Sequence, residues 1–134
     1  MQTVTTPSAS ERFVVDSSGW IEYLSAGKKA AQFATYLEGS ADIFLPSIVT
    51  YEVLKKLLRE GSREIAERFF SLALGFGERE IPLDASLALH AARVSLDTRL
   101  AMADAIIYAT AQLKAAQLVT TDPHFSGLPG ATVL

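Results

Sequence analysis

The stretch from Phe13 to Gly19, which reads FVVDSSG, decides how the rest of the chain is interpreted. Its first three residues are apolar without alternation, which is typical of a short strand covered on both faces, as in a parallel sheet. The run ends at the carboxylate of Asp16, and a helix is predicted to follow. Asp16 is therefore expected at the carboxyl end of a strand, the edge at which open α/β sheets bind ligands. A helix cap is an equally good interpretation of this stretch alone, because aspartate is a favoured N-cap residue.

Short apolar runs alternate with helical patterns along the rest of the chain. The predicted strands are 12–15, 42–45, 79–83, 118–121 and 131–134, and the predicted helices are 19–25, 29–37, 46–59, 62–74, 84–95 and 101–115. Pro82 weakens the third strand and suggests a sheet edge. Strands that alternate with helices predict right-handed crossovers and a three-layer α/β/α sandwich with a central, mostly parallel sheet of four or five strands. We expect one domain, residues 12–134, after a flexible tail, residues 1–11.

The composition limits the class of protein. The chain has 134 residues, of which 49% are hydrophobic and 20% charged, so it can bury a core. It contains no cysteine, which excludes a disulfide scaffold, thiolate catalysis and a cysteine-type zinc site. Residues 1–11 lack the features of a signal peptide, and no apolar run approaches the roughly 20 residues that span a bilayer. We expect a cytoplasmic protein that does not associate with membranes.

Four acidic residues are predicted to meet at one edge of the sheet. Asp16 and Asp122 each follow a predicted strand, Glu52 lies in the second turn of one predicted helix, and Asp104 lies in the first turn of another. A crossover helix runs antiparallel to the strands, so its first turns lie beside their carboxyl ends. All four carboxylates are therefore expected at the carboxyl edge.

Each of these acids also has a structural interpretation. Asp104 lies in a helix that is apolar nearly all round, where a buried carboxylate needs a stabilising partner, and an N-cap would supply one. Glu52 precedes Lys55 and Lys56 by three and four residues, which is the favourable order for a surface ion pair. Asp122 precedes a proline and is a natural N-cap. Because a carboxylate can cap a helix and bind a cation at once, these interpretations do not exclude a joint site.

Taken together, the four acids favour a divalent cation. Adjacent carboxylates repel one another, and oxygen-only ligands favour Mg²⁺ or Mn²⁺ over zinc. Such ions activate water and neutralise charge on a phosphodiester. Without the four acids the formal net charge of −3 becomes +1, so the rest of the surface is nearly neutral. Basic residues that would hold a polynucleotide backbone, or simply form a solvated face, are Lys55, Lys56, Arg59, Arg93 and Arg99.

Four segments of the sequence carry a resemblance to a known family. They read VVDSS at 14–18, PSIVTYEV at 46–53, ADAIIYATA at 103–111 and LVTTDPHF at 118–125. In this order and spacing the chain resembles PIN-domain ribonucleases, in particular VapC-type toxins of prokaryotic toxin–antitoxin pairs. The resemblance covers nearly everything from residue 13 to residue 134. It implies a PIN-like fold and an Mg²⁺- or Mn²⁺-dependent endoribonuclease that cleaves RNA with metal-activated water.

The resemblance also implies roles for particular residues. The acidic quartet, which holds the metal and is catalytic, falls on Asp16, Glu52, Asp104 and Asp122. The residues expected to contact the substrate or to support the acids are Ser17, Thr120 and Thr121. Many relatives carry a further acid immediately before the phenylalanine of the last segment, where this chain has His124.

The partners implied by the resemblance are RNA (tRNA and rRNA are the candidates), an antitoxin protein, and a second copy of the chain in a homodimer. Family members are held inactive by an antitoxin peptide in a groove. The apolar run from Phe69 to Leu74 is a candidate lining for that groove, but packing in the core or at the dimer contact is the better interpretation of it.

Two other functions are compatible with an acidic edge. Phosphoryl transfer through an aspartyl phosphate is disfavoured, because a phosphatase of that kind needs a second acid two residues after its nucleophile and Ser18 occupies that position. A receiver-like domain needs a lysine after a late strand, and none follows residues 118–121. The second alternative is a partner-binding PIN-like domain whose acidic cluster is inert, which the sequence does not exclude.

Overall fold

A computed structural model describes residues 7–134 and shows a five-stranded, all-parallel sheet in the order β3-β2-β1-β4-β5. The strands are β1 (Arg12–Val15), β2 (Asp42–Pro46), β3 (Glu80–Ile81), β4 (Gln117–Thr120) and β5 (Ala131–Val133). The helices are α1 (Ser17–Leu24), α2 (Ala30–Leu37), α3 (Ser47–Arg59), α4 (Arg63–Leu74), α5 (Ala85–Thr98) and α6 (Met102–Leu113). Two short 3₁₀ turns are η1 (Gly77–Arg79) and η2 (Pro123–Phe125). The predicted α/β sandwich with a parallel sheet is confirmed.

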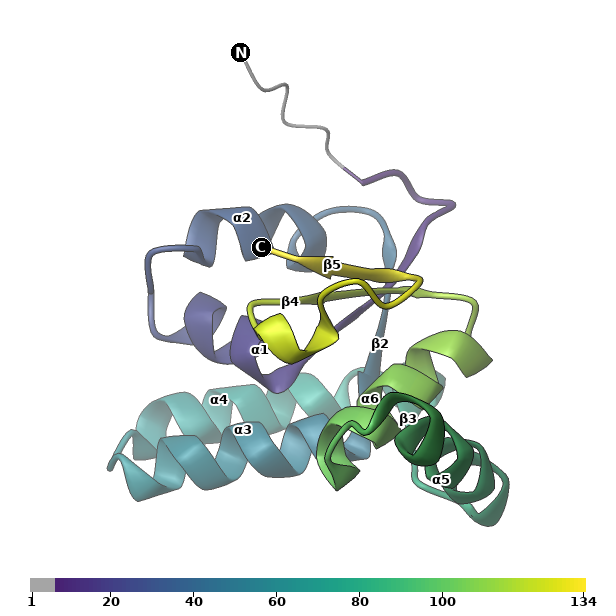
Figure 1. The fold of residues 1–134 in the computed structure, drawn as a ribbon. Coiled ribbons are helices and arrows are strands. Elements are labelled where there is room, and N and C mark those ends of the chain that lie inside the picture. Colours follow the sequence, from purple (N-terminus) through teal and green to yellow (C-terminus); the bar gives the residue numbers. More distant parts are fainter. Residues whose placement is uncertain (1–6) are drawn as a thin grey trace.

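The helices form layers on the two sides of the sheet (Figure 1). On one side α1 packs against β1 and β4, with α2 beside it. On the other side α6 contacts β1, β2 and β4, and α5 covers α6. The α3–α4 hairpin contacts both α1 and α6 through α3, so it lies across the end of the sheet where β1 and β2 finish. That end is the carboxyl edge.

The core lies between the central strands and these helices. Val14 and Val15 of β1 and Leu118 and Val119 of β4 are all fully buried, as expected for strands covered on both faces. Trp20 of α1 extends this core toward the hairpin, where its ring meets that of a buried phenylalanine of α4 edge to face, with the centroids 5.3 Å apart. The β1–α1 junction is therefore held by packing from two layers.

Most predicted elements are present, and the differences have local causes. Residue 46 was expected to be the first residue of a helix, but it ends β2 and caps α3 with extended backbone. The fifth helix was expected to end near Ser95. It continues to Thr98, whose hydroxyl bonds the carbonyl of Val94, and ends at Arg99 with left-handed backbone (φ 62°). Both predicted edge strands are present at the sheet edges, but β3 is limited to Glu80–Ile81, because Arg79 belongs to η1 and Pro82 follows.

The predicted N-terminal tail is only partly covered by the structure, because residues 1–6 lie outside the described part of the chain. Ser8 and Glu11 close a turn, in which the Ser8 N–H donates to the Glu11 carboxylate at 2.9 Å. Across residues 7–134 we find no helix with both the length and the apolar character needed to cross a membrane.

Gly19 is fixed by close packing at the β1–α1 junction. A Cβ atom at this position would lie 2.5 Å from the ring of Phe33 and 2.6 Å from a methyl group of Val15. We expect Gly19→Ala to lower the free energy of unfolding by about 1–3 kcal/mol, because overpacking moves buried neighbours. Urea denaturation measures this. Gly75→Ala is the milder control, since its nearest new contact would be at 3.3 Å. Equal stability of the two variants would contradict the packing described.

Candidate active site

The four predicted acids come from four elements that end or begin at the carboxyl edge. Asp16 follows β1 directly, and Asp122 lies two residues after β4. Glu52 lies in the second turn of α3, and Asp104 in the first turn of α6. Because β1 lies between β2 and β4 at the centre of the sheet, the loops and helices that carry these acids surround the end of β1.

Asp16 is the most buried of these acids, with 3% of its surface exposed. One carboxylate oxygen accepts from the Ser18 hydroxyl at 2.7 Å and from the Gly19 N–H at 3.0 Å, which caps α1. The other accepts from the Thr120 hydroxyl at 2.5 Å. Burial raises the pKa of Asp16, and the charge of Asp122 adds to that rise, although the three hydrogen bonds oppose it. Asp16 is therefore both a cap and part of the acidic edge.

Thr120 links two of the acid-bearing loops. Its buried hydroxyl donates to Asp16 and accepts the backbone N–H of Asp122 at 2.9 Å. Both capacities of the hydroxyl are used, so it fixes the end of β1 relative to the turn after β4.

Replacement of that hydroxyl is expected to cost stability. Thr120→Val keeps the shape of the side chain but leaves a buried carboxylate oxygen and a backbone N–H without this partner. We expect the free energy of unfolding to fall by about 1–3 kcal/mol, as for other buried polar groups left unpaired. Thr120→Ser, which retains the hydroxyl, should lose less. Denaturation curves of the two variants compare them, and a valine variant as stable as the serine variant would contradict the linking role.

Asp104 is not a helix cap. Ala101 is the N-cap residue of α6, and Asp104 lies in the first turn with its side chain partly exposed. Burial, followed by the charges of Asp122, Glu52 and Asp16 in that order, raises the pKa of Asp104 to about 6. All three other acids are therefore close enough to Asp104 to disfavour its ionised form.

Asp122 and His124 form a short pair next to Asp104. Asp122 caps η2 by accepting the His124 N–H at 2.9 Å, and the same oxygen lies 2.9 Å from the ring nitrogen Nδ1 of His124. His124 opposes the rise in the pKa of Asp104. Asp122 thus does what its position before a proline predicted, while the imidazole joins the acidic cluster.

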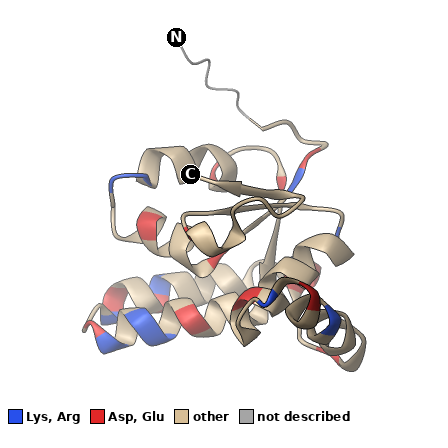
Figure 2. Ribbon diagram, viewed as in Figure 1, with Lys and Arg blue, Asp and Glu red and all other residues tan. Residues whose placement is uncertain are grey.

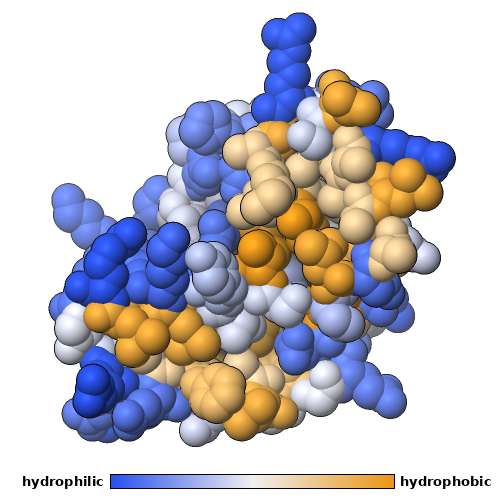
Figure 3. All heavy atoms as spheres, turned by 90° about the horizontal axis from the view of Figure 1, so that it is seen from below, coloured by the Kyte–Doolittle hydropathy of each residue, from blue (hydrophilic) through white to orange (hydrophobic). Residues whose placement is uncertain are grey.

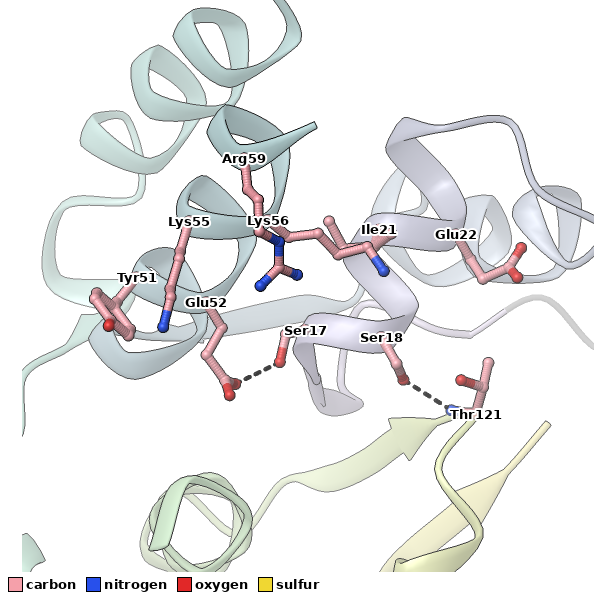
Figure 4. A pocket seen from close by; sticks show the side chains of 10 residues that line it. All are labelled: Ser17, Ser18, Ile21, Glu22, Tyr51, Glu52, Lys55, Lys56, Arg59 and Thr121. Carbon is pink, nitrogen blue, oxygen red and sulfur yellow. Dashed lines mark hydrogen bonds between the residues drawn. The ribbon is translucent and has the colours of Figure 1, made fainter. Parts of the chain in front are cut away.

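Glu52 is directed toward α1 and not toward its own helix. Its carboxylate accepts from the Ser17 hydroxyl at 2.5 Å (Figure 4). Among the residues that the structure describes, Glu52 forms no ion pair with Lys55 or Lys56, and the latter lies 3.7 Å from Glu60. The surface pair that the spacing suggested is therefore absent.

The cluster can be tested for its fit to a cation. Asp104, Asp122 and His124 each offer a ligand atom, and these atoms lie within 4.8 Å of one another. The 2.9 Å between Asp122 and His124 is close to the roughly 3 Å that separates neighbouring ligands in an octahedron with bonds of about 2.1 Å. This group does not include Asp16 or Glu52. The donor set, mostly oxygen with one imidazole, fits a divalent ion such as Mg²⁺ or Mn²⁺.

The structure thus brings two of the predicted acids into one tight group and leaves two at its border. Asp16 is held through Thr120, and Glu52 through Ser17. Thr121 lines the neighbouring hollow, and its N–H donates to the Ser18 hydroxyl at 3.2 Å (Figure 4). From the sequence, His124 is interpreted as a residue near the site that could touch RNA, with a plain turn residue as the preferred interpretation. Its place two residues after an acid that follows a strand was the available signal for more.

Solved structures of similar fold include parts of three complexes. The matching chain of a toxin–antitoxin complex from Klebsiella pneumoniae is 24% identical, with a TM-score of 0.69 over 90% of this chain and 95% of that one. A chain of FitAcB from Neisseria gonorrhoeae is 21% identical, with a TM-score of 0.68 over 84% and 88%. A chain of VapBC2 from Rickettsia felis, bound to a DNA fragment from the promoter, is 15% identical, with a TM-score of 0.67 over 92% and 97%. At these identities the likeness shows a shared fold.

A search among curated proteins finds no significant match. The sequence model of the PIN domain matches residues 13–131, which include most of β1, all four acids and the first residue of β5. The chain therefore belongs to the PIN-domain family, as the resemblance of its four motifs predicted.

Proposed function

We propose that this protein is a divalent-metal-dependent endoribonuclease and the toxin of a toxin–antitoxin pair. The observation that carries the proposal is the convergence on Asp104, whose pKa is raised by the charges of Asp16, Glu52 and Asp122. A protein gains nothing in stability from such repulsion, and a bound cation relieves it. Membership of the PIN-domain family supports the nuclease activity, because proteins of this family are typically nucleases.

Asp104 and Asp122 would hold the cation, and Asp16 and Glu52 would contribute further negative charge beside it. The ion, Mg²⁺ or Mn²⁺, would supply activation of water and neutralisation of charge on the phosphodiester. The protein's own contribution is orientation. The hydroxyl of Thr120 fixes Asp16 relative to Asp122, and the hydroxyl of Ser17 holds Glu52 across from them.

The proposed partners are RNA, an antitoxin protein and a second copy of this chain, in a cytoplasmic setting. The fold neighbour from Klebsiella pneumoniae was solved as a toxin–antitoxin complex, which supports an antitoxin. The exposed face of α3, α4 and α5 supports protein contacts, because it displays two apolar areas (Figure 3). The run 69–74 is divided between core and surface, since Phe69 and Ala73 are buried while Phe70, Leu72 and Leu74 are exposed.

One assay separates this proposal from its alternatives. The purified protein is incubated with labelled tRNA and rRNA in Mg²⁺ or Mn²⁺, then with EDTA, and then as the Asp104→Asn variant. Cleavage that is lost in both controls supports the nuclease. Cleavage that survives EDTA or the substitution would contradict it, a stable phospho-aspartate would favour phosphoryl transfer, and inertness toward every RNA tested would favour a partner-binding domain.

A further inference from the structure

A basic flank adjoins the acidic edge on the side of α3. A surface hollow of about 530 Å³ lies between α1 and α3, and Ser17 and Glu52 border it on the side of the acids. Three cations line the same hollow, Lys55, Lys56 and Arg59. In Figure 4 the Arg59 and Lys56 side chains extend from α3 across the hollow toward α1, while Lys55 lies beside Tyr51. We call Tyr51, Lys55, Lys56 and Arg59 the α3 arm.

The cations of the α3 arm do not form ion pairs with the acids of the site. Within residues 7–134, neither Lys55 nor Arg59 forms an ion pair, and Lys56 pairs only with Glu60 of its own helix at 3.7 Å. That pair is exposed and therefore weak. Glu52 is bonded to Ser17 instead. A protein of net charge −3 thus keeps three positive charges together beside its acidic cluster, along the basic stretch of α3 seen in Figure 2.

Tyr51 gives the arm an aromatic surface. Its side chain is 56% exposed and lines the hollow next to Glu52, with the ammonium group of Lys55 5.6 Å from the ring centroid. Positive charge together with an exposed ring is the combination by which proteins bind single-stranded nucleic acid, because phosphates meet the cations and a base stacks on the ring. An exposed tyrosine in this position is thus explained by a ligand with both charge and π-faces.

A fourth cation lies beside the acids in a different hollow. Arg99 lines a smaller hollow of about 250 Å³ whose other lining residues include Asp104 and His124. Its left-handed backbone ends α5 and begins the short connection to α6. The two hollows therefore border the acidic cluster from different sides, one at Glu52 and one at Asp104.

We propose that the α3 arm and Arg99 bind a single RNA strand on opposite sides of the phosphodiester that is cleaved. The strand enters along one hollow, crosses the acids and leaves along the other, with a base stacked on Tyr51. This assignment rests on the proposed nuclease function, and it identifies the binding surface as one for unpaired RNA. Of the five basic residues considered from the sequence, Lys55, Lys56, Arg59 and Arg99 take part, whereas Arg93 lines neither hollow.

A binding measurement tests the α3 arm independently of catalysis. The probe is a fluorescein-labelled single-stranded oligoribonucleotide of about 12 nucleotides, within the usual range of roughly 4–16, and the protein carries Asp104→Asn so that the RNA stays intact. Adding Lys55→Gln and Arg59→Gln should raise the Kd about tenfold. The slope of log Kd against log salt concentration should fall by about 1.4, since each phosphate contact with a single strand contributes about 0.7.

Matched variants separate position from charge and stacking from the hydroxyl group. Arg68→Gln removes a positive charge from α4 outside both hollows and should leave the Kd unchanged. Tyr51→Leu should weaken binding at least fivefold, as loss of one stacked base does, whereas Tyr51→Phe should not. The proposal is overturned if the α3 variants bind as tightly as their parent, or if Arg68→Gln weakens binding as much as they do. The α3 arm would then be assigned to contact with a protein partner.

A cleavage measurement tests the two-sided arrangement. In oligonucleotides that are cleaved at one bond, a neutral methylphosphonate replaces one phosphate on the 5′ or on the 3′ side of that bond. For the double variant of the α3 arm, a neutral phosphate on one side of the cleaved bond should no longer change kcat/KM. For Arg99→Gln, the same should hold for a neutral phosphate on the other side. A double-mutant cycle measures both couplings. Coupling of both variants to the same side, or to neither, would overturn the proposal while leaving cleavage intact. Absence of cleavage in the unsubstituted protein would instead refute the proposed function.

Discussion

The Asp104→Asn variant is expected to cleave RNA more than 100-fold more slowly than the unsubstituted protein. Removal of a mere hydrogen-bond partner of a metal ligand costs roughly 10- to 100-fold, and Asp104 offers a ligand atom itself. The amide that replaces the carboxylate keeps its size but loses the charge that balances a dication. Initial rates with saturating Mn²⁺ measure the loss.

The same substitution should make the metal-free protein more stable at pH 7. Because the pKa of Asp104 is raised to about 6 in the folded protein, ionisation there opposes folding, and the amide removes that cost. After allowance for the exposed part of the side chain, we expect a gain of about 1–2 kcal/mol. Asp97→Asn on the exposed surface of α5 is the matched control and should change neither property. A variant that loses both activity and stability would indicate a structural role and contradict the assignment.

Divalent cations are expected to raise the Tm of the protein by about 10 °C when their concentration reaches about 100 times the Kd. Binding to the folded state alone then contributes about 2.7 kcal/mol, and each kcal/mol moves the Tm of a domain this size by roughly 4 °C. Thermal scans with Mn²⁺, with Mg²⁺ and with added EDTA measure the effect. No shift in either metal would contradict a cation site, and a shift of equal size in Asp104→Asn would place the ion elsewhere.

The pH dependence of stability provides an independent test of the same cluster. The folded pKa of Asp104, about 6, lies above its ordinary value of 3.8, so between these values the folded state binds more protons than the unfolded state. The metal-free protein should therefore become more stable as the pH falls from 7 toward 4, and the raised pKa of Asp16 acts in the same direction. Protons compete with the metal, so the metal-induced shift in Tm should shrink below about pH 6.

The sequence predicted the central strands β1 and β4 well because each contains a short apolar run that ends at polar residues. The run before Asp16 and the run before Thr121 are buried and form β1 and β4 in the interior of the sheet. Their apolar character therefore agrees with their position in the sheet. Topology alone then placed the acids at one edge. It could not show which acids would form the tight group, since that depends on side-chain rotamers.

Two details of the site depend on competition between partners that spacing does not reveal. Glu52 has lysines three and four residues ahead, yet it bonds the hydroxyl of Ser17, because α1 brings that group across the edge. The imidazole of His124 folds back on Asp122 because η2 makes a tight turn there. Both outcomes are set by tertiary contacts, which the pattern of one chain does not contain.

The crowding around Gly19 has a consequence for the redesign of this protein. With no room for even a methyl group beside Phe33 and Val15, and with the Gly19 N–H bonded to Asp16, position 19 accepts no side chain unless buried neighbours move. Engineering of the proposed RNA contacts should therefore leave Gly19 unchanged. Under that proposal, the solvent-facing positions of α3 and Arg99, which ends α5, are the places to substitute.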